Sequence, residues 1–377
     1  MASITKVNGR WKVRYWTPDG QHQKAKTFDL KSEAQKFARR VETAKDRGEW
    51  IDPVLGRTTF AKWSERFMDT TVHLKPKTRS GYEGLLRTLL LPAFGHLPLV
   101  TLQPLHVRQW IADLSDRGLS PSRIRQAHFL LGAIMRSAIE SGYIVKNPCI
   151  GIKPPKIATR EMHFLSGEEV EQLAQATPKP FEVLIYTLAY GGLRWGEAVA
   201  LRRKRCDLLR SRLEVRESLA EVNGELHFGP TKTYLSRRVV VPRFLAEMLA
   251  DHLAHNVVDA PDALVFSMSG APLRHHTFHK RFWLPAVNKA AVVGGLRIHD
   301  LRHTCAALLI AQGAHPKQIQ MHLGHSSITV TMDRYGHLFP DHMETLAQGL
   351  EATFQKARVS CVCPERDSDV LQLPKVR

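Results

Sequence analysis

The sequence is poor in cysteine and has no long apolar run. Its five cysteines in 377 residues are few and odd in number, which argues against a disulfide framework and for a reducing compartment. The longest stretch without Asp, Glu, Lys or Arg, residues 88–107, contains three prolines and two histidines, so it cannot form a membrane-spanning helix. Residues 1–16 hold no apolar signal core. We therefore expect a cytoplasmic protein with no membrane partner.

Motifs for cofactors and metals are also missing. The sequence has no glycine-rich phosphate-binding loop and no dinucleotide fingerprint. Cys361 and Cys363 are too close together for a zinc-binding pair, and no second ligand pair follows them. We expect neither a cofactor nor a metal.

Positive charge, by contrast, is abundant. Lys and Arg number 54 against 36 Asp and Glu, which gives a net charge of +18 and an isoelectric point near 9.9. Most of the excess lies in the first 160 residues. A positive electrostatic field of this kind is suited to binding a polyanion such as DNA or RNA. The alternative is a basic surface that only keeps the protein soluble. A dehydrogenase or a secreted hydrolase does not fit this composition.

The first 57 residues have the pattern of a three-stranded antiparallel sheet followed by one helix. Asn8-Gly9 is typical of a two-residue hairpin turn between the first two strands. Ser32 and Gln35 have the spacing of a capping box at the start of the helix. The expected strands carry five basic residues that we predict to contact DNA: Arg10, Lys12, Arg14, Lys24 and Lys26.

Residues 58–155 have the pattern of a compact helical bundle, preceded by a linker at residues 51–56. Ser120 and Pro121 supply an N-cap and a proline at the first position of its last helix. Arg123 and Arg125 lie outside the apolar face of that helix and are further candidate DNA contacts. The expected helices cover residues 60–72, 78–91, 104–117 and 120–140.

Residues 160–355 combine more helices with a second small sheet. A hairpin is expected from residues 212–222 and 225–228, with residues 237–241 as a third strand. Residues 356–377 form a tail for which we have no role. The fold class is therefore mainly α with small β-sheets (α+β).

Four short segments of the third region carry reactive side chains. They are, in chain order, Gly192-Leu193-Arg194-Trp195-Gly196-Glu197; Pro230-Thr231-Lys232-Thr233 with Ser236-Arg237-Arg238; His299-Asp300-Leu301-Arg302-His303; and Leu323-Gly324-His325 leading to Arg334-Tyr335-Gly336-His337. Together and in this order they resemble the tyrosine recombinase (integrase) family over roughly residues 160–350. The residues that match the family's catalytic set are Arg194, Lys232, His299, Arg302, His325 and Tyr335. None of the six is substituted.

The resemblance implies that Tyr335 attacks a DNA phosphate and forms a 3′-phosphotyrosyl bond, which preserves the energy of the broken bond. It assigns the clamp on the phosphate to Arg194 and Arg302, and guanidinium groups suit that task because they grip two oxygens and stay charged. It gives Lys232 the protonation of the departing 5′ oxygen.

The resemblance also implies that His299 and His325 hydrogen-bond the phosphate, with His299 the better candidate for proton transfer. Glu197 lies one helical turn beyond Arg194 and is expected to orient it.

Less specific interpretations compete with these assignments. His299 and His303 have the spacing of a metal pair, but no third ligand follows at a known interval. The basic run at residues 202–205 either touches DNA or solvates a loop. Three further histidines are expected to face solvent or DNA without a catalytic role. They are His275, His276 and His279.

The front of the chain is similar to other parts of integrases. Residues 58–155 resemble the core-binding domain that clamps duplex DNA with the catalytic domain, here residues 160–355. Residues 1–57 resemble the arm-type DNA-binding domain of phage and mobile-element integrases. The resemblance implies a homotetramer on double-stranded DNA at core and arm sites, helped by an excisionase and a DNA-bending protein and associated with the nucleoid.

Two other functions stay open at this point. A topoisomerase-like enzyme would nick and reseal one duplex without exchanging partners. A DNA-binding regulator would keep the fold without the chemistry.

Overall fold

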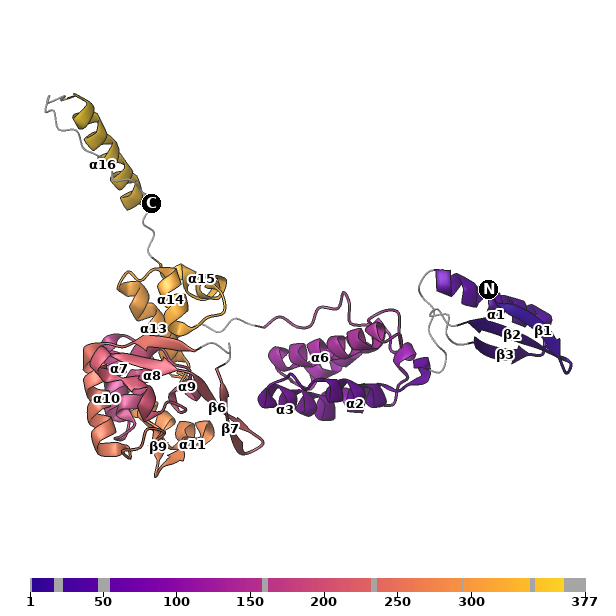
Figure 1. The fold of residues 1–377 in the computed structure, drawn as a ribbon, viewed down its shortest axis with the longest axis horizontal. Coiled ribbons are helices and arrows are strands. Elements are labelled where there is room, and N and C mark those ends of the chain that lie inside the picture. Colours follow the sequence, from indigo (N-terminus) through magenta and orange to yellow (C-terminus); the bar gives the residue numbers. More distant parts are fainter. Residues whose placement is uncertain are drawn as a thin grey trace, which may run out of the picture. The chain divides into compact units, whose positions relative to one another are not determined.

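A computed structural model describes residues 2–16, 23–46, 55–157, 162–231, 236–292, 294–339 and 343–362 (Figure 1). Residues 1–160 belong to one compact unit, and residues 161–221 and 226–377 form the other. Most of the linker expected at residues 51–56 lies outside the described residues. No helix in the described part of the chain combines the length and the apolar character that crossing a membrane requires.

The chain begins with the expected antiparallel sheet, in the order β1-β2-β3. Its strands are β1 (Ser3–Val7), β2 (Arg10–Trp16) and β3 (Gln23–Phe28). Asn8 and Gly9 take the positive φ values, 47° and 80°, that a tight hairpin turn requires. Helix α1 (Lys31–Asp46) covers one face and buries Val13 and Tyr15. The capping box predicted at Ser32 is wrong, because the helix already begins at Lys31 and Ser32 lies in its first turn.

A four-helix bundle follows, as predicted from the apolar spacing. Its main helices are α2 (Phe60–Thr70), α3 (Pro76–Leu85), α5 (Pro104–Asp116) and α6 (Pro121–Glu140), with short 3₁₀ turns η1 (Leu55–Arg57) and η3 (Leu99–Thr101). The Ser120 hydroxyl accepts a hydrogen bond from the Arg123 amide, so the predicted N-cap is confirmed. Leu130, Leu131 and Ile134 of α6 are fully buried in the core.

Helix α3 does not end where predicted. It continues as a π-helical segment, η2 (Leu86–Leu90), into the short helix α4 (Leu91–Phe94). Pro92 has no N–H to donate to a carbonyl one turn earlier, so a regular α-helical pattern cannot pass through it. The π-helical widening carries the chain past this position.

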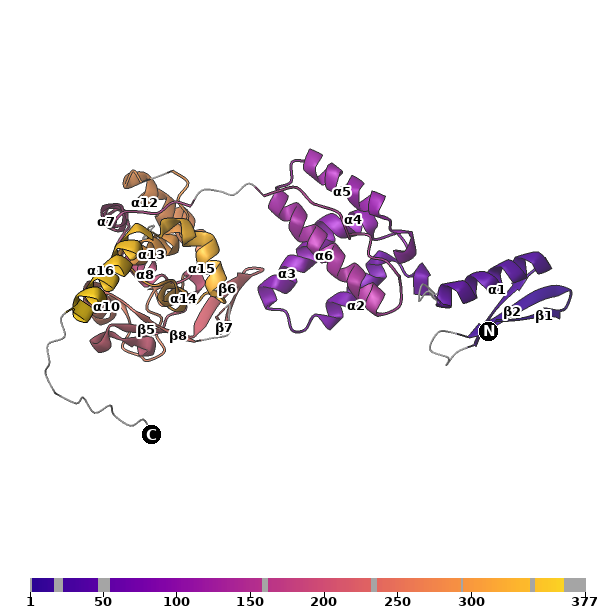
Figure 2. The same cartoon turned by 90° about the horizontal axis from the view of Figure 1, so that it is seen from above.

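The second unit is built around two helices that are buried nearly all round. Helix α8 (Glu182–Gly191) packs against α13 (Asp300–Ala311), and α14 (Pro316–Leu323) and α15 (Ile328–Tyr335) lie beside α13 (Figure 2). A helix without a polar face must be enclosed by other elements. The surrounding helices are α7 (Gly167–Ala176), α9 (Trp195–Ala198), α10 (Arg243–Asn256), α11 (His275–Phe278), η6 (His279–Trp283) and α12 (Leu284–Lys289).

The predicted hairpin of this unit is present on either side of residues 223–224, but the strand predicted to lead into it is divided. The predicted strand over residues 212–222 is broken at Arg216, so β5 (Arg212–Val215) and β6 (Glu217–Val222) belong to different sheets. β5 lies between β4 (Cys206–Asp207) and β8 (Arg237–Val240), whereas β6 pairs with β7 (Glu225–Pro230). Beyond the break, Glu217 forms an ion pair with Arg202 rather than continuing the ladder of β5.

The remaining elements are small or terminal. They are the strands β9 (Ser267–Met268) and β10 (Ala271–Pro272), the 3₁₀ turns η4 (Arg203–Arg205), η5 (Leu208–Arg210) and η7 (Gly336–Leu338), and the last helix α16 (Met343–Val362).

Candidate active site

Arg194 lies at the turn between α8 and α9. Gly192 ends α8 in the left-handed conformation at φ 65°, and a Cβ there would come within 2.6 Å of Leu323 and 2.9 Å of Cys305, so only glycine fits. Arg194 then caps α9, and its Nη1 donates to Glu197 Oε1 at 2.8 Å. Its Nη2 donates to the Gly324 carbonyl at 3.2 Å.

Glu197 holds a second arginine as well. Arg237, the first residue of β8, donates from Nη2 to Glu197 Oε2 at 2.7 Å and from Nη1 to Oε1 at 3.1 Å. Its Nε donates to the His322 carbonyl at 3.0 Å. Burial alone would raise the pKa of Glu197, but the hydrogen bonds and charges of Arg237 and Arg194 outweigh it and lower the pKa to about 2. One buried carboxylate therefore fixes two guanidinium groups.

Arg302 lies on α13 and is only 2% exposed. Its Nη1 donates to the Gly192 carbonyl and its Nη2 to the Leu323 carbonyl, both at 2.6 Å. Burial, and secondarily the charge of Arg194, lowers the pKa of Arg302 to about 9, so the group stays cationic at neutral pH. These two bonds to main-chain carbonyls fix the plane of the guanidinium group.

His299 and His325 flank these arginines. His299 is the N-cap residue of α13 and is open to solvent, yet enough protein surrounds its ring that desolvation, with the charges of His303 and Arg302, lowers its pKa to about 4. His325 follows Gly324, which ends α14 at φ 67°. Its Nδ1 lies 2.8 Å from Thr331 Oγ1.

His325 is uncharged at neutral pH. Burial, followed by the charges of Arg302 and Arg194, lowers its pKa to about 3. The hydroxyl of Ser327 accepts a hydrogen bond from the Val330 amide and so caps the start of α15. A neutral imidazole offers one N–H donor and one acceptor, which suits hydrogen bonding to a phosphate oxygen.

Tyr335, the last residue of α15, is completely buried. Its hydroxyl lies 2.7 Å from His303 Nδ1. Its ring is nearly parallel to that of His325, at 14° and 6.2 Å between centroids. Burial raises the pKa of Tyr335, while the cations Arg302 and Arg334 oppose that shift. The phenol therefore shares one cluster with the predicted arginines and histidines of its own chain.

Lys232 lies outside the described residues, after β7 ends at Pro230 and before β8 begins at Arg237. Its neighbour Thr231 is 1% exposed. Five of the six predicted catalytic residues and Glu197 thus come together, and the sixth belongs to a segment that leads directly to Arg237.

Sequence reasoning missed three residues of this cluster. Arg237 belongs to one of the four reactive segments but had no role, His303 was weighed only as a metal ligand, and Thr331 was not considered. The contact between Arg237 and Glu197 spans 40 residues, so no local spacing reveals it. Within the described residues, no group of three or more His, Cys, Asp or Glu side chains is placed to hold a metal ion.

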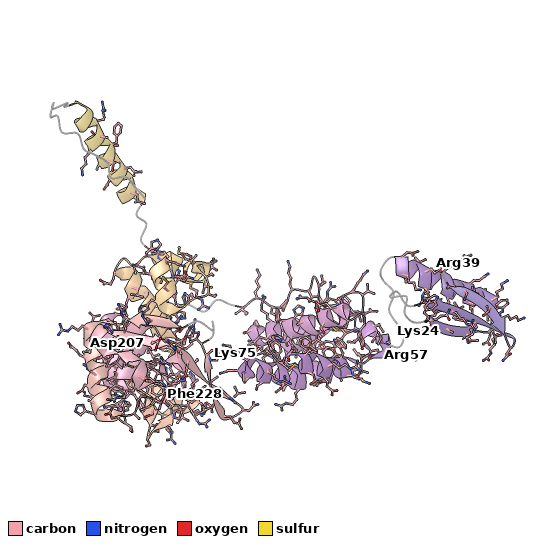
Figure 3. All side chains as sticks on the ribbon, viewed as in Figure 1. Lys24, Arg39, Arg57, Lys75, Asp207 and Phe228 are labelled. Carbon is pink, nitrogen blue, oxygen red and sulfur yellow. The ribbon has the colours of Figure 1, made fainter. Side chains whose placement is uncertain are left out.

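The predicted DNA-contacting residues of the first sheet do not share one face. In the register of β2 and β3, Val13 is opposite Lys26 and Tyr15 is opposite Lys24, so both lysines are on the side covered by α1. Lys24 is labelled on this sheet in Figure 3. The Lys26 ammonium lies 5.0 Å from the ring centre of Phe37 on that helix. The residues that alternate onto the open face are Arg10, Lys12 and Arg14.

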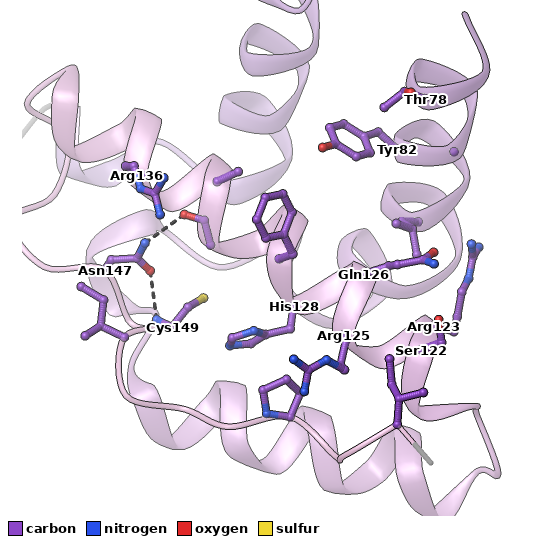
Figure 4. A pocket seen from close by; sticks show the side chains of 18 residues that line it. Thr78, Tyr82, Ser122, Arg123, Arg125, Gln126, His128, Arg136, Asn147 and Cys149 are labelled. Atoms are coloured by element: carbon purple, nitrogen blue, oxygen red, sulfur yellow. Dashed lines mark hydrogen bonds between the residues drawn. The ribbon is translucent and has the colours of Figure 1, made fainter. Parts of the chain in front are cut away.

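Arg123 and Arg125 of α6 line a cavity of about 680 Å³ between α3 and α6 (Figure 4). Beside it, the Asn147 amide donates to the Gly132 carbonyl and its oxygen accepts from the Cys149 amide, both at 2.9 Å. These bonds hold the segment after α6 against the helix.

The basic run at residues 202–205 is neutralised by acids. Each of its four cations forms an ion pair within the second unit; the partners are Glu217 for Arg202, Asp259 for Arg203, Asp262 for Lys204 and Glu214 for Arg205. This pairing favours the interpretation of the run as a structural loop.

Comparison with known proteins places this geometry in a family. Residues 163–342 match the model of the phage integrase family, and residues 59–115 match that of the phage integrase N-terminal SAM-like domain. A putative prophage phiRv2 integrase of Mycobacterium tuberculosis is 30% identical over 88% of this chain and 89% of its own length. The integrase of Mycobacterium phage D29 is 29% identical over 87% of this chain and 90% of its own length.

Solved structures show the same fold. A Tn1549 transposon integrase in complex with a circular intermediate DNA superposes with a TM-score of 0.68, at 20% identity, over 78% of this chain and 99% of that one. A lambda integrase tetramer bound to a Holliday junction gives a TM-score of 0.57, at 18% identity, over 89% of this chain and 94% of that one.

Proposed function

The chain belongs to the phage integrase family of site-specific recombinases, and we propose that it breaks DNA with the hydroxyl of Tyr335. The observation that carries this proposal is the position of that hydroxyl. It lies in a buried cluster with His303 and His325, under the direct influence of the Arg302 charge. A phenol beside fixed cations is suited to attack a phosphate.

In the proposed reaction, Tyr335 Oη bonds to phosphorus as the bond from phosphorus to the 5′ oxygen breaks. Arg194 and Arg302 hold the non-bridging oxygens, where negative charge accumulates in the transition state. His299 and His325 donate further hydrogen bonds, and Lys232 protonates the 5′ oxygen. The freed 5′ hydroxyl of the partner duplex then attacks the phosphotyrosyl bond, so strands exchange without a cofactor.

We infer that Glu197 is the residue that orients the clamp. It accepts hydrogen bonds from Arg194 and Arg237 while being only 2% exposed. Preorganised donors lower the barrier because they need not rearrange as charge develops. Arg237 therefore joins the predicted set as a residue that stabilises Glu197.

We assign DNA binding to the earlier parts of the chain. The bundle of residues 58–155 would bind the core site, which its match to the SAM-like domain model at residues 59–115 supports. Residues 1–57 would bind separate arm sites through the open face of β2. The excisionase and the DNA-bending protein expected from the sequence belong to this same proposal, as partners on the arm-site DNA.

We further propose that the active form is a tetramer on two duplexes and that α16 contacts a neighbouring subunit. Leu346, Leu350 and Phe354 repeat at four-residue intervals along this helix and are 54–73% exposed. An apolar stripe at helical spacing is a surface suited to a partner. Tyr335 itself packs among the residues of its own chain, which supports attack at the site of the same subunit.

Replacement of the nucleophile tests the proposed chemistry. Tyr335→Phe keeps the ring and removes only the attacking oxygen, so it should bind a nicked suicide substrate normally and form no covalent adduct on a denaturing gel. A matched control is Tyr82→Phe on α3, which should form the adduct at the parent rate. An adduct with Tyr335→Phe would place the nucleophile elsewhere and refute the proposal.

A further inference from the structure

His303 contacts the attacking oxygen more closely than any residue assigned so far. It follows Arg302 on α13, and its side chain is buried, with the residue 5% exposed. Its Nδ1 lies 2.7 Å from the Tyr335 hydroxyl, across 32 residues of sequence. The two rings are tilted by 59° with centroids 5.8 Å apart, so they meet through these polar atoms rather than by stacking.

The direction of this hydrogen bond follows from burial. A completely buried phenol must donate its proton to some acceptor, because an unpaired buried O–H is costly. Among the described residues, His303 Nδ1 is the one acceptor within hydrogen-bonding distance of the Tyr335 oxygen. The nearby cations Arg302 and Arg334 offer only donors. The phenol therefore donates to Nδ1, and the imidazole carries its own proton on Nε2.

The surroundings keep the His303 imidazole neutral. Desolvation by burial is the main cause that lowers its pKa, to about 4, and Asp300 opposes that shift. Arg334, Arg297 and Arg302 lower the pKa further. The ring is therefore neutral at pH 7, and its Nδ1 lone pair accepts the hydrogen bond of the phenol.

We propose that His303 is the general base of strand cleavage, accepting the phenolic proton on Nδ1 as Tyr335 Oη bonds to phosphorus. The inference rests on the proposed role of Tyr335. The balance is complete: the bond from Oη to phosphorus forms, the bond from phosphorus to the 5′ oxygen breaks, and Lys232 supplies the proton for that oxygen. During resealing, the 5′ hydroxyl returns its proton to Lys232 and His303 returns its proton to Oη.

This assignment moves proton transfer away from His299. The His299 ring meets His303 edge to face at 4.9 Å between centroids, and in the described part of the chain no hydrogen bond joins His299 to Tyr335. His299 is open to solvent, where a DNA phosphate would lie. It is therefore placed to bind the phosphate, while His303 is placed to deprotonate the nucleophile.

The test separates proton transfer from positioning. In His303→Asn, the amide oxygen can still accept the hydrogen bond near the place of Nδ1 but cannot take the proton. Single-turnover formation of the covalent adduct should slow by on the order of a hundredfold or more, the range of general base catalysis, with DNA affinity unchanged. The matched control is His252→Asn on α10, since His252 is 4% exposed and its Nε2 lies 2.8 Å from the Val265 carbonyl, on an element that carries none of the proposed catalytic residues.

A modified substrate shows whether a variant has lost deprotonation of the nucleophile or protonation of the leaving oxygen. A 5′-bridging phosphorothiolate leaves as a thiolate and needs no proton donor, so it should restore cleavage to Lys232→Ala but not to His303→Asn. Restoration of His303→Asn by this substrate would assign His303 to the leaving group and overturn the inference.

Different results would refute the role of Tyr335 as nucleophile and the role of His303 as general base. Cleavage by His303→Asn within a fewfold of the parent, with Tyr335→Phe inactive, would refute the role of His303 alone. An adduct with Tyr335→Phe would refute the proposed nucleophile. If His303→Asn fails to fold by thermal unfolding, His303→Gln serves in its place, and parent-like cleavage by that variant again refutes the base.

Discussion

Arg237 and Glu197 form an ion pair that is almost completely buried: their side chains are 10% and 1% exposed, and Arg237 Nη2 lies 2.7 Å from Glu197 Oε2. The same carboxylate binds Arg194 at 2.8 Å. Two cations that would repel each other are thereby held on one anion. The geometry of the phosphate clamp thus depends on a residue that never needs to touch the DNA.

Removing this carboxylate should destabilise the protein. Glu197→Ala leaves Arg237 buried without a counterion, which costs about 3–5 kcal/mol of unfolding free energy. Urea unfolding of the variant measures the loss. Glu247→Ala is the control, because its pair with Arg243 is 63% and 90% exposed and should contribute at most about 1 kcal/mol. Equal effects of the two substitutions would show that the buried pair is not a stabilising anchor.

Arg302→Lys should slow cleavage while sparing DNA binding. A lysine ammonium cannot bond both the Gly192 and Leu323 carbonyls and still present a planar fork to the phosphate. We expect adduct formation to fall by on the order of a hundredfold or more, as for loss of an oxyanion donor. Arg281→Lys, at an exposed position of η6, should cleave at the parent rate. Parent-like cleavage by Arg302→Lys would contradict the clamp role.

Stability should fall in mildly acidic solution because the fold lowers the pKa of the partly buried His322. Burial, followed by the charge of Arg237, lowers the pKa of His322 to about 4, against 6.5 as its ordinary value. Between pH 6.5 and 4 the unfolded chain binds a proton at this ring and the folded chain does not, so the unfolding free energy falls as pH falls. His322→Gln should make the decline in urea midpoint shallower. His255→Gln, at an exposed position of α10, should leave the decline as steep as in the parent.

The open face of β2 should carry arm-site binding. Replacing Arg10, Lys12 and Arg14 by Gln should weaken binding to arm-site DNA and reduce the slope of its salt dependence by about one unit for each phosphate that the variant no longer binds. Cleavage at the core site should stay unchanged. Deletion of residues 1–57 should likewise leave cleavage at the core site unchanged and should impair integration between two substrates. Lys24→Gln, on the side of the sheet covered by α1, is the matched control. Unchanged integration by the deletion variant would remove the arm-site assignment.

The local features of this protein were predictable because they depend on neighbours in sequence. Ser120 caps α6 through the amide three residues later, and Asn8-Gly9 turns the chain because both residues accept positive φ. Where a local signal competed with packing, prediction was wrong. The strand pattern continued past Arg216, yet the chain leaves the sheet there and Glu217 pairs with Arg202.

The sequence by itself determined which reactive side chains the protein has, where most helices begin, and that the first 160 residues carry the positive charge. Only the tertiary structure decided how those side chains are held. The contact of Tyr335 with His303 spans 32 residues, that of Arg302 with Gly192 spans 110, and that of Arg194 with Gly324 spans 130. Such contacts arise when α8, α13 and α14 bury their apolar surfaces together, and no periodicity within one segment encodes which polar atoms then meet.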